Sequence, residues 1–549
     1  MTWNLAAASN PVGIEWRPVR GLAITMPGDM TLQQQLESAL SHHQAGRFAE
    51  AETIYRQILS QNPNHVEALN LLGTLAAQAG RLDAGLELMR RVIRLHPDLA
   101  QAHYNIGIAL QRKGQLDEAI ASYHQTIRLK PDFAEAYNNL GSALQDIGQL
   151  DEAITAFRQA IRLKPDHPGA HVNLGNVLTD MGQLDEAIAC YRQAVRIKPD
   201  LALAHNNLGN ALKDIGQLDE AIAACQQAIR IKPDYAEAHW NLALALLMSG
   251  DFERGLAEYE WRWRVKSMWV APSFSQPQWM GEELGGRTIL LFPEQGLGDA
   301  IQFVRYVPLV TRRGGRVIIA CQPELARLFE RMPDVARVVV SGQPIPPFDV
   351  QCSLVGLPRI FATDLNSIPA AIPYLTADSG LVETWSKRLG PTDGRLRVGI
   401  AWSGSPRFKA NLTRSLNLQQ LAPLAAAPGV KFYSLQKGPA GEQAKNPPVG
   451  LELVDLGPQL KDLADTAAVM SLMDLIITTD TSVPHLAGAL AKPVWVMLQH
   501  VPDWRWLLER QDSPWYPTMR LFRQPSRGDW DSVIKRVADE LSLLIENRA

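Results

Sequence analysis

The chain has 549 residues, enough for three or four domains, and its 54 basic against 57 acidic side chains give a formal net charge of −3. This near-neutral balance predicts no nucleic-acid partner, because such proteins usually carry a clearly basic face. Four cysteines without C-x-x-C spacing, and no apolar run of the roughly 18 residues that a membrane span needs, predict a cytoplasmic protein with free thiols and no membrane span.

The N-terminal half follows a different composition from the rest. Residues 1–30 show no periodic pattern, and we expect either a disordered leader or an artefact of an upstream start site. Tryptophan is then absent from residues 17–239, whereas 12 of the 14 tryptophans lie in residues 240–549. Two regions of different construction are therefore predicted.

The first region is a repeat with a period of 34 residues. Seven glycines keep this step from Gly46 to Gly250, and six prolines keep it from Pro63 to Pro233. Each unit places Leu-Gly in a first helix, Ala-x3-aromatic in a second, and a proline at its end, which identifies a tetratricopeptide repeat. We predict an α-solenoid of seven repeats over residues 31–268.

A row of asparagines follows the same period inside the first helix of each repeat. Asparagine is a mediocre helix former, so five in one phase require a reason. Their amides could hold the backbone of an extended peptide, and the row resembles the asparagine ladder of the eukaryotic O-linked N-acetylglucosamine transferases. The alternative is that asparagine is simply common at this position of near-consensus repeats. The row consists of Asn105, Asn139, Asn173, Asn207 and Asn241.

Beyond a predicted linker at 269–284, short apolar runs alternate with helical stretches. Such runs are typical of buried parallel strands in a doubly wound sheet. The first series is 288–292, 316–320, 335–340 and 348–354, and the second is 397–402, 430–436, 451–456, 475–480, 494–498 and 519–523.

These two series predict an α/β region of two Rossmann-like lobes. A stretch rich in proline and glycine at 366–394 separates them, and we place the inter-lobe linker at 379–394. The N-terminal lobe is then 285–378, the C-terminal lobe 395–525, and a final core-packing helix falls within 526–549. Ligands of such folds bind at the carboxyl ends of the strands.

The first candidate junction follows the strand 288–292 with the sequence Pro-Glu-Gln-Gly-Leu-Gly-Asp. Gly298 lets the chain turn tightly, and Asp299 lies at the start of the next helix. A carboxylate at this edge of the sheet could act as a general base on an acceptor hydroxyl. The alternative role is an ordinary cap of the helix.

The second candidate junction follows the strand 475–480. Asp480 ends the strand, and a helix with proline near its start begins at Thr481-Ser482. Free backbone N–H groups and the positive end of the helix dipole make this an anion site suited to a diphosphate. His485, one turn into the helix, could add a ring N–H; it could equally be a surface residue.

Together the two junctions resemble the paired motifs of bacterial heptosyltransferase-type glycosyltransferases over roughly residues 285–525. The resemblance implies a GT-B fold of two Rossmann-like lobes, a nucleotide-diphosphate sugar as donor, inversion at the anomeric carbon, and no metal or other cofactor. It implies that Asp299 is the base and that Asp480, Thr481 and His485 form the diphosphate motif. Ser482 stands where the family usually has glycine.

The same resemblance implies a basic residue after the first strand of the C-terminal lobe. Lys409 and Arg414 are both candidates for contact with the diphosphate, and Gln436 is a candidate for support of the donor site. Two other motifs are less favoured: Asp529-Trp530-Asp531 is expected to cap a helix rather than bind a metal, and residues 503–506 either border the substrates or make cation–π packing between the lobes.

These observations predict an inverting, metal-independent glycosyltransferase whose repeats hold a protein or peptide acceptor, an architecture similar to the O-linked N-acetylglucosamine transferases. Two alternatives remain. The acceptor could be a polysaccharide or a lipid-linked glycan, with the repeats only recruiting partners. The chain could also be a non-catalytic adaptor with a decayed GT-B unit.

Overall fold

The computed structural model of the chain describes residues 30–265, 273–406 and 411–547. These residues divide into two compact units. The first comprises residues 30–212 and 227–233, and the second comprises 213–226 and the described residues from 234 onward.

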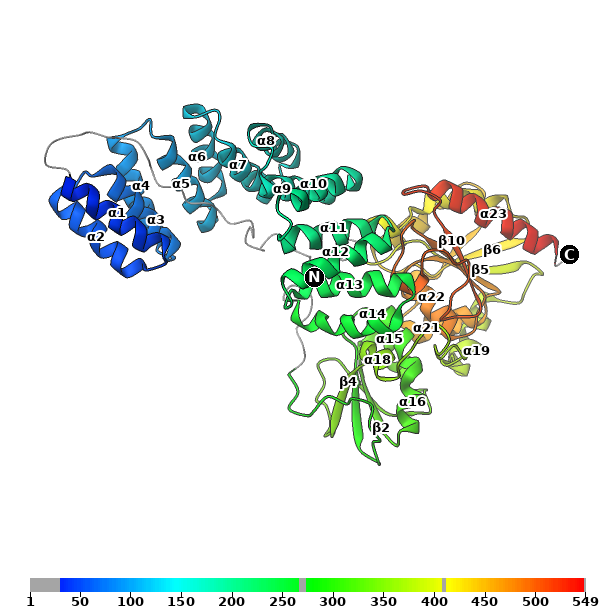
Figure 1. Ribbon diagram of the computed structural model, residues 1–549. Coiled ribbons are helices and arrows are strands. Elements are labelled where there is room, and N and C mark those ends of the chain that lie inside the picture. The colour runs from blue at the N-terminus through cyan, green and yellow to red at the C-terminus, as the bar shows by residue number, and fades with distance from the viewer. Residues whose placement is uncertain (1–29, 266–272, 407–410, 548–549) are drawn as a thin grey trace. The chain divides into compact units, whose positions relative to one another are not determined.

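Antiparallel helix pairs make up the first unit, as expected for tetratricopeptide repeats (Figure 1). The first helices of successive repeats are α1 (Met30–Gln44), α3 (Val66–Gln78), α5 (Ala100–Lys113), α7 (Ala134–Asp146), α9 (Pro168–Asp180) and α11 (Ala202–Asp214). The second helices are α2 (Phe48–Gln61), α4 (Leu82–Leu95), α6 (Leu116–Leu129), α8 (Leu150–Leu163), α10 (Leu184–Ile197) and α12 (Leu218–Ile231).

Glycine has two separate roles in each repeat. The glycines between the two helices, such as Gly148 with φ +83°, adopt the left-handed backbone conformation that other residues avoid. The glycine inside the first helix admits an aromatic ring from the second: a Cβ atom on Gly141 would lie 2.7 Å from the ring of Phe157. The 34-residue spacing marks glycine at both positions, and the structure gives the reason for each.

The last repeat belongs to the second unit, as do residues 213–226, which include most of α12. Its helices are α13 (Ala236–Ser249) and α14 (Phe252–Tyr259), followed by the 3-10 turn η2 (Glu260–Arg264). Residues of these elements share one apolar core with the α/β region; Leu247, Phe252 and Tyr259 are buried with Trp504 and Trp515. The seventh repeat is thus built into the α/β unit.

Within the described residues, ten parallel strands form two sheets, as the alternating pattern predicted. The first sheet contains β1 (Thr288–Phe292), β2 (Arg316–Cys321), β3 (Val335–Val340) and β4 (Val350–Ser353) in the order β3-β2-β1-β4. The second contains β5 (Leu396–Ala401), β6 (Val430–Ser434), β7 (Leu453–Asp455), β8 (Leu475–Thr479), β9 (Val494–Leu498) and β10 (Met519–Arg523) in the order β10-β9-β8-β5-β6-β7.

Helices connect these strands and supply the rest of the core. They are α15 (Leu297–Phe303), α16 (Val307–Arg312), α17 (Ala326–Phe329), α18 (Leu357–Ile360), α19 (Ser379–Leu389), α20 (Asn411–Arg414), α21 (Leu463–Ser471), α22 (Ser482–Ala489) and α23 (Trp530–Glu546). On one face of the second sheet, Val398, Ile477 and Met497 pack with Val533 and Val537 of α23, which confirms the predicted core-packing helix.

Residues 269–272 of the first predicted linker lie outside the described residues, and the described parts of both linkers, 273–284 and 379–394, are more ordered than their proline and glycine content suggested. Residues 379–394 contain the helix α19, whose Trp385 is fully buried and donates its Nε1–H to Asp465 at 3.0 Å. Within 269–284, the backbone N–H of Trp279 donates to the carbonyl of Gln351 on β4 at 2.8 Å. In each segment a buried tryptophan packs into the core. The free energy gained by burying its large apolar side chain outweighs the tendency of proline and glycine to disrupt regular structure.

Asp529 caps α23, as expected. Its Oδ1 atom accepts the backbone N–H of Ser532 at 3.0 Å. The first carboxylate of the Asp-x-Asp motif therefore has a structural role as a helix cap.

Replacing Gly141 with alanine should destabilise the repeat region by about 1–3 kcal/mol, because the added methyl group overlaps the Phe157 ring. Urea unfolding followed by far-UV circular dichroism measures this loss. The matched comparison is Gly141→Ala in a Phe157→Leu background, where the smaller side chain should relieve part of the penalty. An equal loss in both backgrounds would contradict the packing explanation.

Candidate functional site

Both sheets have a topological switch point, and both candidate junctions lie there. The chain order reverses between β1 and β4 in the first sheet and between β5 and β8 in the second. Crevices outside the carboxyl ends of such strands are the usual ligand sites of open α/β sheets. The loop after β1 leads into α15, and the loop after β8 leads into α22.

The structure brings these two junctions together. A Cβ atom on Gly298 of α15 would lie 3.4 Å from the Cα of Ser482 and 2.9 Å from Cδ2 of His485, both on α22. Glycine at 298 is therefore required by the close approach of two helix starts, one from each lobe. The sequence assigned this glycine to a tight turn, and its contact with His485 could not be predicted.

Asp299 lies in the first turn of α15 and is largely buried, with its side chain 21% exposed. Its Oδ2 atom accepts the backbone N–H of Gly296 at 2.7 Å, so the carboxylate does contribute to capping the helix. Its Oδ1 atom accepts a hydrogen bond from Nη2 of Arg505 at 2.5 Å. Capping and a position at the mouth of the site are thus compatible roles for this residue.

Arg505 lies on the 3-10 turn η9 (Trp504–Trp506), in the segment 503–506, for which the sequence suggested only a border of the substrates or cation–π packing. Besides Asp299, its guanidinium donates to Oε1 of Gln302 at 2.7 Å and to Oδ1 of Asp503 at 2.8 Å. It also lies 4.5 Å from the ring centroid of Trp504. The cation–π packing expected for this segment is present, but the same cation is also the ion-pair partner of Asp299.

Burial raises the pKa of Asp299 above its ordinary value, although the positive charge of Arg505 opposes this shift. The negative charge of Asp503 adds to the increase, and the Gly296 N–H and Arg414 oppose it. A raised pKa makes a carboxylate a better proton acceptor, which is the property that a general base requires.

The start of α22 has the geometry expected of an anion site. Thr481 is the N-cap, and its Oγ1 atom accepts the backbone N–H of Val483 at 3.2 Å. Ser482 occupies the first helical position, and both side chains are partly exposed. Pro484 carries no backbone N–H, so the backbone N–H of Ser482 is the donor of the first three helical positions that is left without a partner in the helix.

His485 is buried, and its ring is fixed from two sides. Its Nδ1 lies 3.0 Å from the hydroxyl of Tyr516, and its ring stacks on Trp506 with centroids 5.3 Å apart. Burial lowers its pKa well below the ordinary value, and the nearby cations Arg505, Arg305 and Arg414 lower it further. The imidazole is therefore neutral at physiological pH and can offer one ring N–H.

Asp480, at the end of β8, is also buried. Burial raises its pKa to about 6, against the opposing positive charge of Arg414. This carboxyl group lies among the same charged residues as Asp299, since Arg414, Asp503 and Arg505 influence the pKa of both.

Of the two basic candidates, Lys409 lies outside the described residues. Arg414, on α20, approaches the loop after β5: a Cβ atom on Gly404 would lie 3.4 Å from Nη2 of Arg414 and 3.5 Å from Cγ2 of Thr481. Its Nε is buried and has no hydrogen-bond partner among the residues that the structure describes. Arg414 thus lies beside the start of α22, and its Nε–H makes no hydrogen bond to any described residue.

Gln436 braces the loop that follows β5. Its Oε1 atom accepts the backbone N–H groups of Trp402 and Ser403 at 3.0 and 2.9 Å, and its Nε2 donates to the carbonyl of Ser403 at 2.8 Å. The amide therefore fixes the path of residues 402–404 toward Gly404 and the start of α22.

The asparagine row lies mostly inside the repeats. Asn105, Asn139 and Asn173 are buried, and their amides donate to the preceding repeat: Asn105 to Asn70 at 3.2 Å and Asn173 to Asn138 at 3.0 Å, for example. Asn139 donates to Tyr104 and Asn207 to Asn176, at 3.1 and 2.8 Å. Asn207 and Asn241 are partly exposed.

These hydrogen bonds join successive repeats, which gives a structural reason for asparagine at the same position of each repeat. A bound peptide would have to share or replace them. Peptide binding by the row stays a prediction, and the partly exposed Asn207 and Asn241 are its most accessible members.

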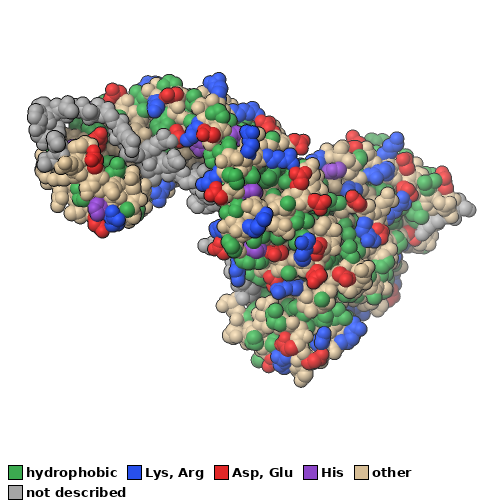
Figure 2. Space-filling view, viewed as in Figure 1, with side chains coloured by type: hydrophobic (Ala, Val, Ile, Leu, Met, Phe, Trp, Pro, Cys, Tyr) green, Lys and Arg blue, Asp and Glu red, His purple; other side chains and the backbone are tan. Residues whose placement is uncertain are grey.

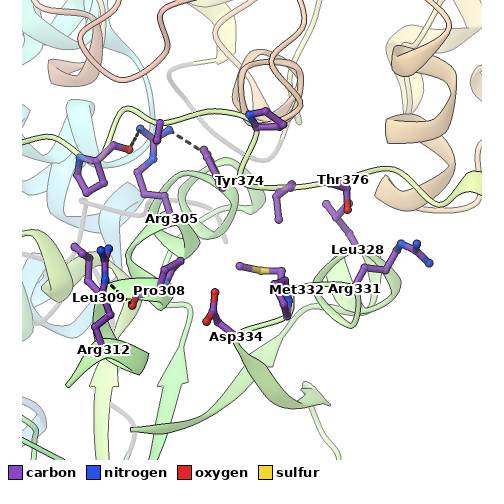
Figure 3. Close-up of a pocket in the computed structure, with 15 residues that line it drawn as sticks. Arg305, Pro308, Leu309, Arg312, Leu328, Arg331, Met332, Asp334, Tyr374 and Thr376 are labelled. Carbon is purple, nitrogen blue, oxygen red and sulfur yellow. Dashed lines mark hydrogen bonds between the residues drawn. The ribbon is translucent and has the colours of Figure 1, made fainter. Parts of the chain in front are cut away.

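A pocket of about 390 Å³ lies elsewhere in the α/β unit (Figure 3). Its walls include Arg305, Leu309, Met332 and Tyr374, and neither Asp299 nor the start of α22 lines it. Arg305 donates to the hydroxyl of Tyr374 at 3.0 Å, and that hydroxyl donates to Tyr516, the partner of His485, at 3.3 Å. The pocket is linked to the site through this hydrogen-bond chain, and neither Asp299 nor the start of α22 forms part of its wall.

On the face drawn in Figure 2, acidic and basic side chains of the described residues are interspersed rather than separated by sign. Within the described ranges, no helix is both long enough and apolar enough to span a membrane. Those ranges also contain no group of three or more His, Cys, Asp or Glu side chains placed to hold a metal ion.

Comparison with known proteins identifies the repeats. Residues 31–261 match the family model of the tetratricopeptide C-terminal domain of cilia- and flagella-associated protein 70. The chain is also 32% identical over 298 residues to protein FlbA of Caulobacter vibrioides, which covers 49% of this chain and 49% of that protein. The chain thus spans about half the length of the curated relative it matches.

Three solved structures are each similar to part of the chain. The crystal structure of MamA is 29% identical, with a TM-score of 0.28, and the match covers 30% of this chain and 97% of that one. YrrB, titled a TPR protein with an unusual peptide-binding site, is 22% identical with a TM-score of 0.29 over 34% and 95% of the two chains. The structure of pilF of Pseudomonas aeruginosa is 18% identical, with a TM-score of 0.35, and the match covers 38% of this chain and 96% of that one.

The N-terminal region is therefore a tetratricopeptide region, a fold whose stacked helices form surfaces for protein partners.

Asp480→Asn should raise the melting temperature at pH 8 and leave it nearly unchanged at pH 4. A folded-state pKa near 6 against an ordinary value of 3.8 means that the charged form is disfavoured in the folded protein. This cost is present above the folded-state pKa and disappears as the carboxyl group is protonated at lower pH. The matched control is Asp512→Asn: that carboxylate pairs with Arg510 at 2.5 Å and its pKa is lowered, so its replacement should not stabilise the protein. Equal melting temperatures of Asp480→Asn and wild type at pH 8 would contradict this assignment.

Proposed function

We propose that the α/β region is an inverting, metal-independent glycosyltransferase of the GT-B type that uses a nucleotide-diphosphate sugar, and that its acceptor is a hydroxyl group of a protein recruited by the tetratricopeptide region. The observation that carries the proposal is the meeting of two helix starts, one from each lobe: Asp299, a carboxylate of raised pKa, lies on α15, and an anion site begins at Thr481 on α22.

The donor diphosphate would bind at the start of α22. The backbone N–H of Ser482 and the helix dipole attract a phosphate there, and the hydroxyls of Thr481 and Ser482 add donors. Arg414 adds a full positive charge beside the same turn, with a buried Nε that lacks a partner among the described residues. These groups would neutralise the leaving group, the task that a divalent cation performs in other glycosyltransferases.

The neutral His485 suits this environment. Its Nδ1 is next to the Tyr516 hydroxyl, and its ring faces Gly298 at the junction of the lobes. An uncharged imidazole places a hydrogen-bond donor or acceptor near the transferred sugar without adding a second charge to a site that already holds Arg414 and Arg505.

Asp299 would act as the general base. The acceptor oxygen attacks the anomeric carbon from the face opposite the diphosphate, and the bond between that carbon and the diphosphate oxygen breaks with its electron pair on the oxygen. The acceptor proton passes to a carboxylate oxygen of Asp299. Because attack is in line with departure, the configuration at the carbon inverts. Arg505 would hold the carboxylate ionised and oriented while it waits for the acceptor.

A protein acceptor is favoured over a polysaccharide or lipid-linked acceptor by the repeats. The tetratricopeptide region supplies a surface suited to protein partners, and its last repeat shares the core of the α/β unit. The α/β unit that carries the site thus also contains a repeat of a fold that binds protein partners.

The test is a panel of radiolabelled UDP-, GDP-, ADP- and dTDP-sugars, with a host lysate as acceptor and EDTA in a parallel set. We expect hydrolysis or protein labelling with at least one donor in both sets. Asp299→Asn should reduce the rate by roughly 10²–10⁴-fold, the usual contribution of a general base. Asp531→Asn, a change in an exposed residue of α23, serves as the matched control and should retain the wild-type rate. No turnover of any donor, or full activity of Asp299→Asn, would refute the proposal.

The pH dependence of kcat/KM offers a second test. A general base works only when deprotonated, so activity should fall on the acid side, with a midpoint above the ordinary aspartate pKa of 3.8. Arg505→Met removes the cation that opposes this shift, and we expect the acid limb to move to higher pH as well as a lower maximal rate. An acid limb that stays in place would show that Arg505 does not act on the titrating group. Arg510→Met, an exposed arginine of the same lobe, is the control.

A further inference from the structure

The last repeat ends in a buried arginine that the proposed reaction does not use. Arg262, in η2, is 1% exposed although it carries a full charge. Its Nη1 donates to Oε1 of Glu260 at 2.7 Å and to the carbonyl of Tyr259 at 3.1 Å. Its guanidinium also lies 4.7 Å from the ring centroid of Trp263. A buried cation of this kind is stable only when its partners are fixed.

The other partner of Arg262 is Glu294, in the loop between β1 and α15. Nε of Arg262 lies 3.1 and 3.0 Å from the two carboxylate oxygens of Glu294, and Nη2 lies 2.9 Å from Oε1. The hydroxyl of Ser353, at the end of β4, donates to the same oxygen. The Glu294 side chain is 3% exposed, so this ion pair is closed to solvent.

The next residue of the loop, Gln295, is also bound by a residue of the last repeat. Nε2 of Gln295 donates to the hydroxyl of Tyr259, the last residue of α14, at 2.7 Å. Two consecutive loop residues are therefore bound by the end of the last repeat. The residue that follows them, Gly296, donates its backbone N–H to Asp299.

These contacts form a continuous path from the last repeat to the candidate base. Arg262 and Tyr259 fix Glu294 and Gln295, the loop carries Gly296, and Gly296 fixes Oδ2 of Asp299.

We propose that Arg262 is a positioning residue for the transfer reaction: through its ion pair with Glu294 it fixes the loop 293–296 and hence the carboxylate of Asp299. The last tetratricopeptide repeat is then a part of the transfer site as well as of the solenoid. This inference rests on the proposed function for its catalytic consequence, whereas the order of the loop can be measured without any activity.

A purely structural role would also require the ion pair, so the test must separate loop order from global folding. Glu294→Gln keeps the shape of the side chain and removes its charge. Arg262→Lys keeps the charge but loses the paired contact, and Arg262→Gln loses both. The matched control is Arg313→Gln, which breaks an exposed ion pair with Glu283 in the same lobe, at 3.0 Å.

The first readout is hydrogen–deuterium exchange of the full-length protein, measured by mass spectrometry on peptides that cover residues 291–303. We expect faster exchange of this segment in Glu294→Gln and Arg262→Gln, an intermediate rate in Arg262→Lys, and wild-type exchange in Arg313→Gln. Peptides from β8 and α22 should keep their protection in all four variants. Unchanged exchange of residues 291–303 in both Glu294→Gln and Arg262→Gln would overturn the inference, whether or not the protein proves to be a glycosyltransferase.

The second readout uses the donor identified in the panel. We expect kcat to fall by about 10–100-fold in Glu294→Gln and Arg262→Gln, because a displacement of about 1 Å at a reacting group costs on that order. The Kd of the corresponding nucleoside diphosphate should stay within about twofold of wild type, since its site on α22 is not part of the path, and Arg262→Lys should recover part of kcat. A weaker nucleoside diphosphate affinity with unchanged kcat would contradict the positioning role.

If the single variants lose the fold, Arg262→Met combined with Glu294→Leu replaces the ion pair by apolar groups of similar volume, an exchange that buried ion pairs often tolerate. This double variant should melt near the wild-type temperature and still show faster exchange of residues 291–303. Wild-type exchange there would overturn the inference. Absence of turnover in the wild-type protein would refute the proposed function alone, because the exchange measurement still decides whether Arg262 orders the loop.

Discussion

The close approach of α15 and α22 constrains the rest of the α/β unit. Two helix starts can meet only if one of them presents a hydrogen atom in place of a side chain, which Gly298 does against His485. Their meeting buries Asp299, and a buried carboxylate needs a compensating charge, which Arg505 supplies at 2.5 Å. The neutral state of His485 follows from the same burial and from the cations around it. Packing, protonation and the proposed chemistry thus depend on one contact.

The last repeat extends this dependence to the helical region. In a solenoid each repeat normally contacts only its neighbours, so a terminal repeat can be lost without changing distant ones. Here the end of the seventh repeat contributes Arg262 and Tyr259 to the loop that precedes Asp299. The boundary between the repeats and the α/β region is consequently a structural junction built of buried charge, which explains why the sequence Glu-Trp-Arg-Trp-Arg interrupts the repeat pattern at this point.

For several residues, the local sequence pattern did not reveal the contacts that they make in the folded protein. The asparagines of the repeats have the spacing of a peptide-binding row, yet three of the five are buried and join successive repeats. Arg505 was noticed only as part of an aromatic and cationic segment, because a local sequence motif does not show that Asp299, 206 residues away, is its partner. Proline and glycine in residues 379–394 suggested a linker, whereas Trp385 anchors a helix there by burying its indole.

The sequence alone determined the repeats and the positions of the strands. A period of 34 residues with glycine at fixed positions identifies tetratricopeptide repeats because only glycine fits the left-handed turn and the contact beneath Phe157. Short apolar runs mark the described strands because buried parallel strands need continuous apolar faces. The sequence also placed Asp299 and Thr481 at strand ends, since strand ends follow from strand limits. Only the tertiary structure decided which strand ends face each other, which charges are paired and which are buried. Those depend on contacts between residues far apart in the chain, such as Asp299 with Arg505 and Arg262 with Glu294, and no local pattern encodes them.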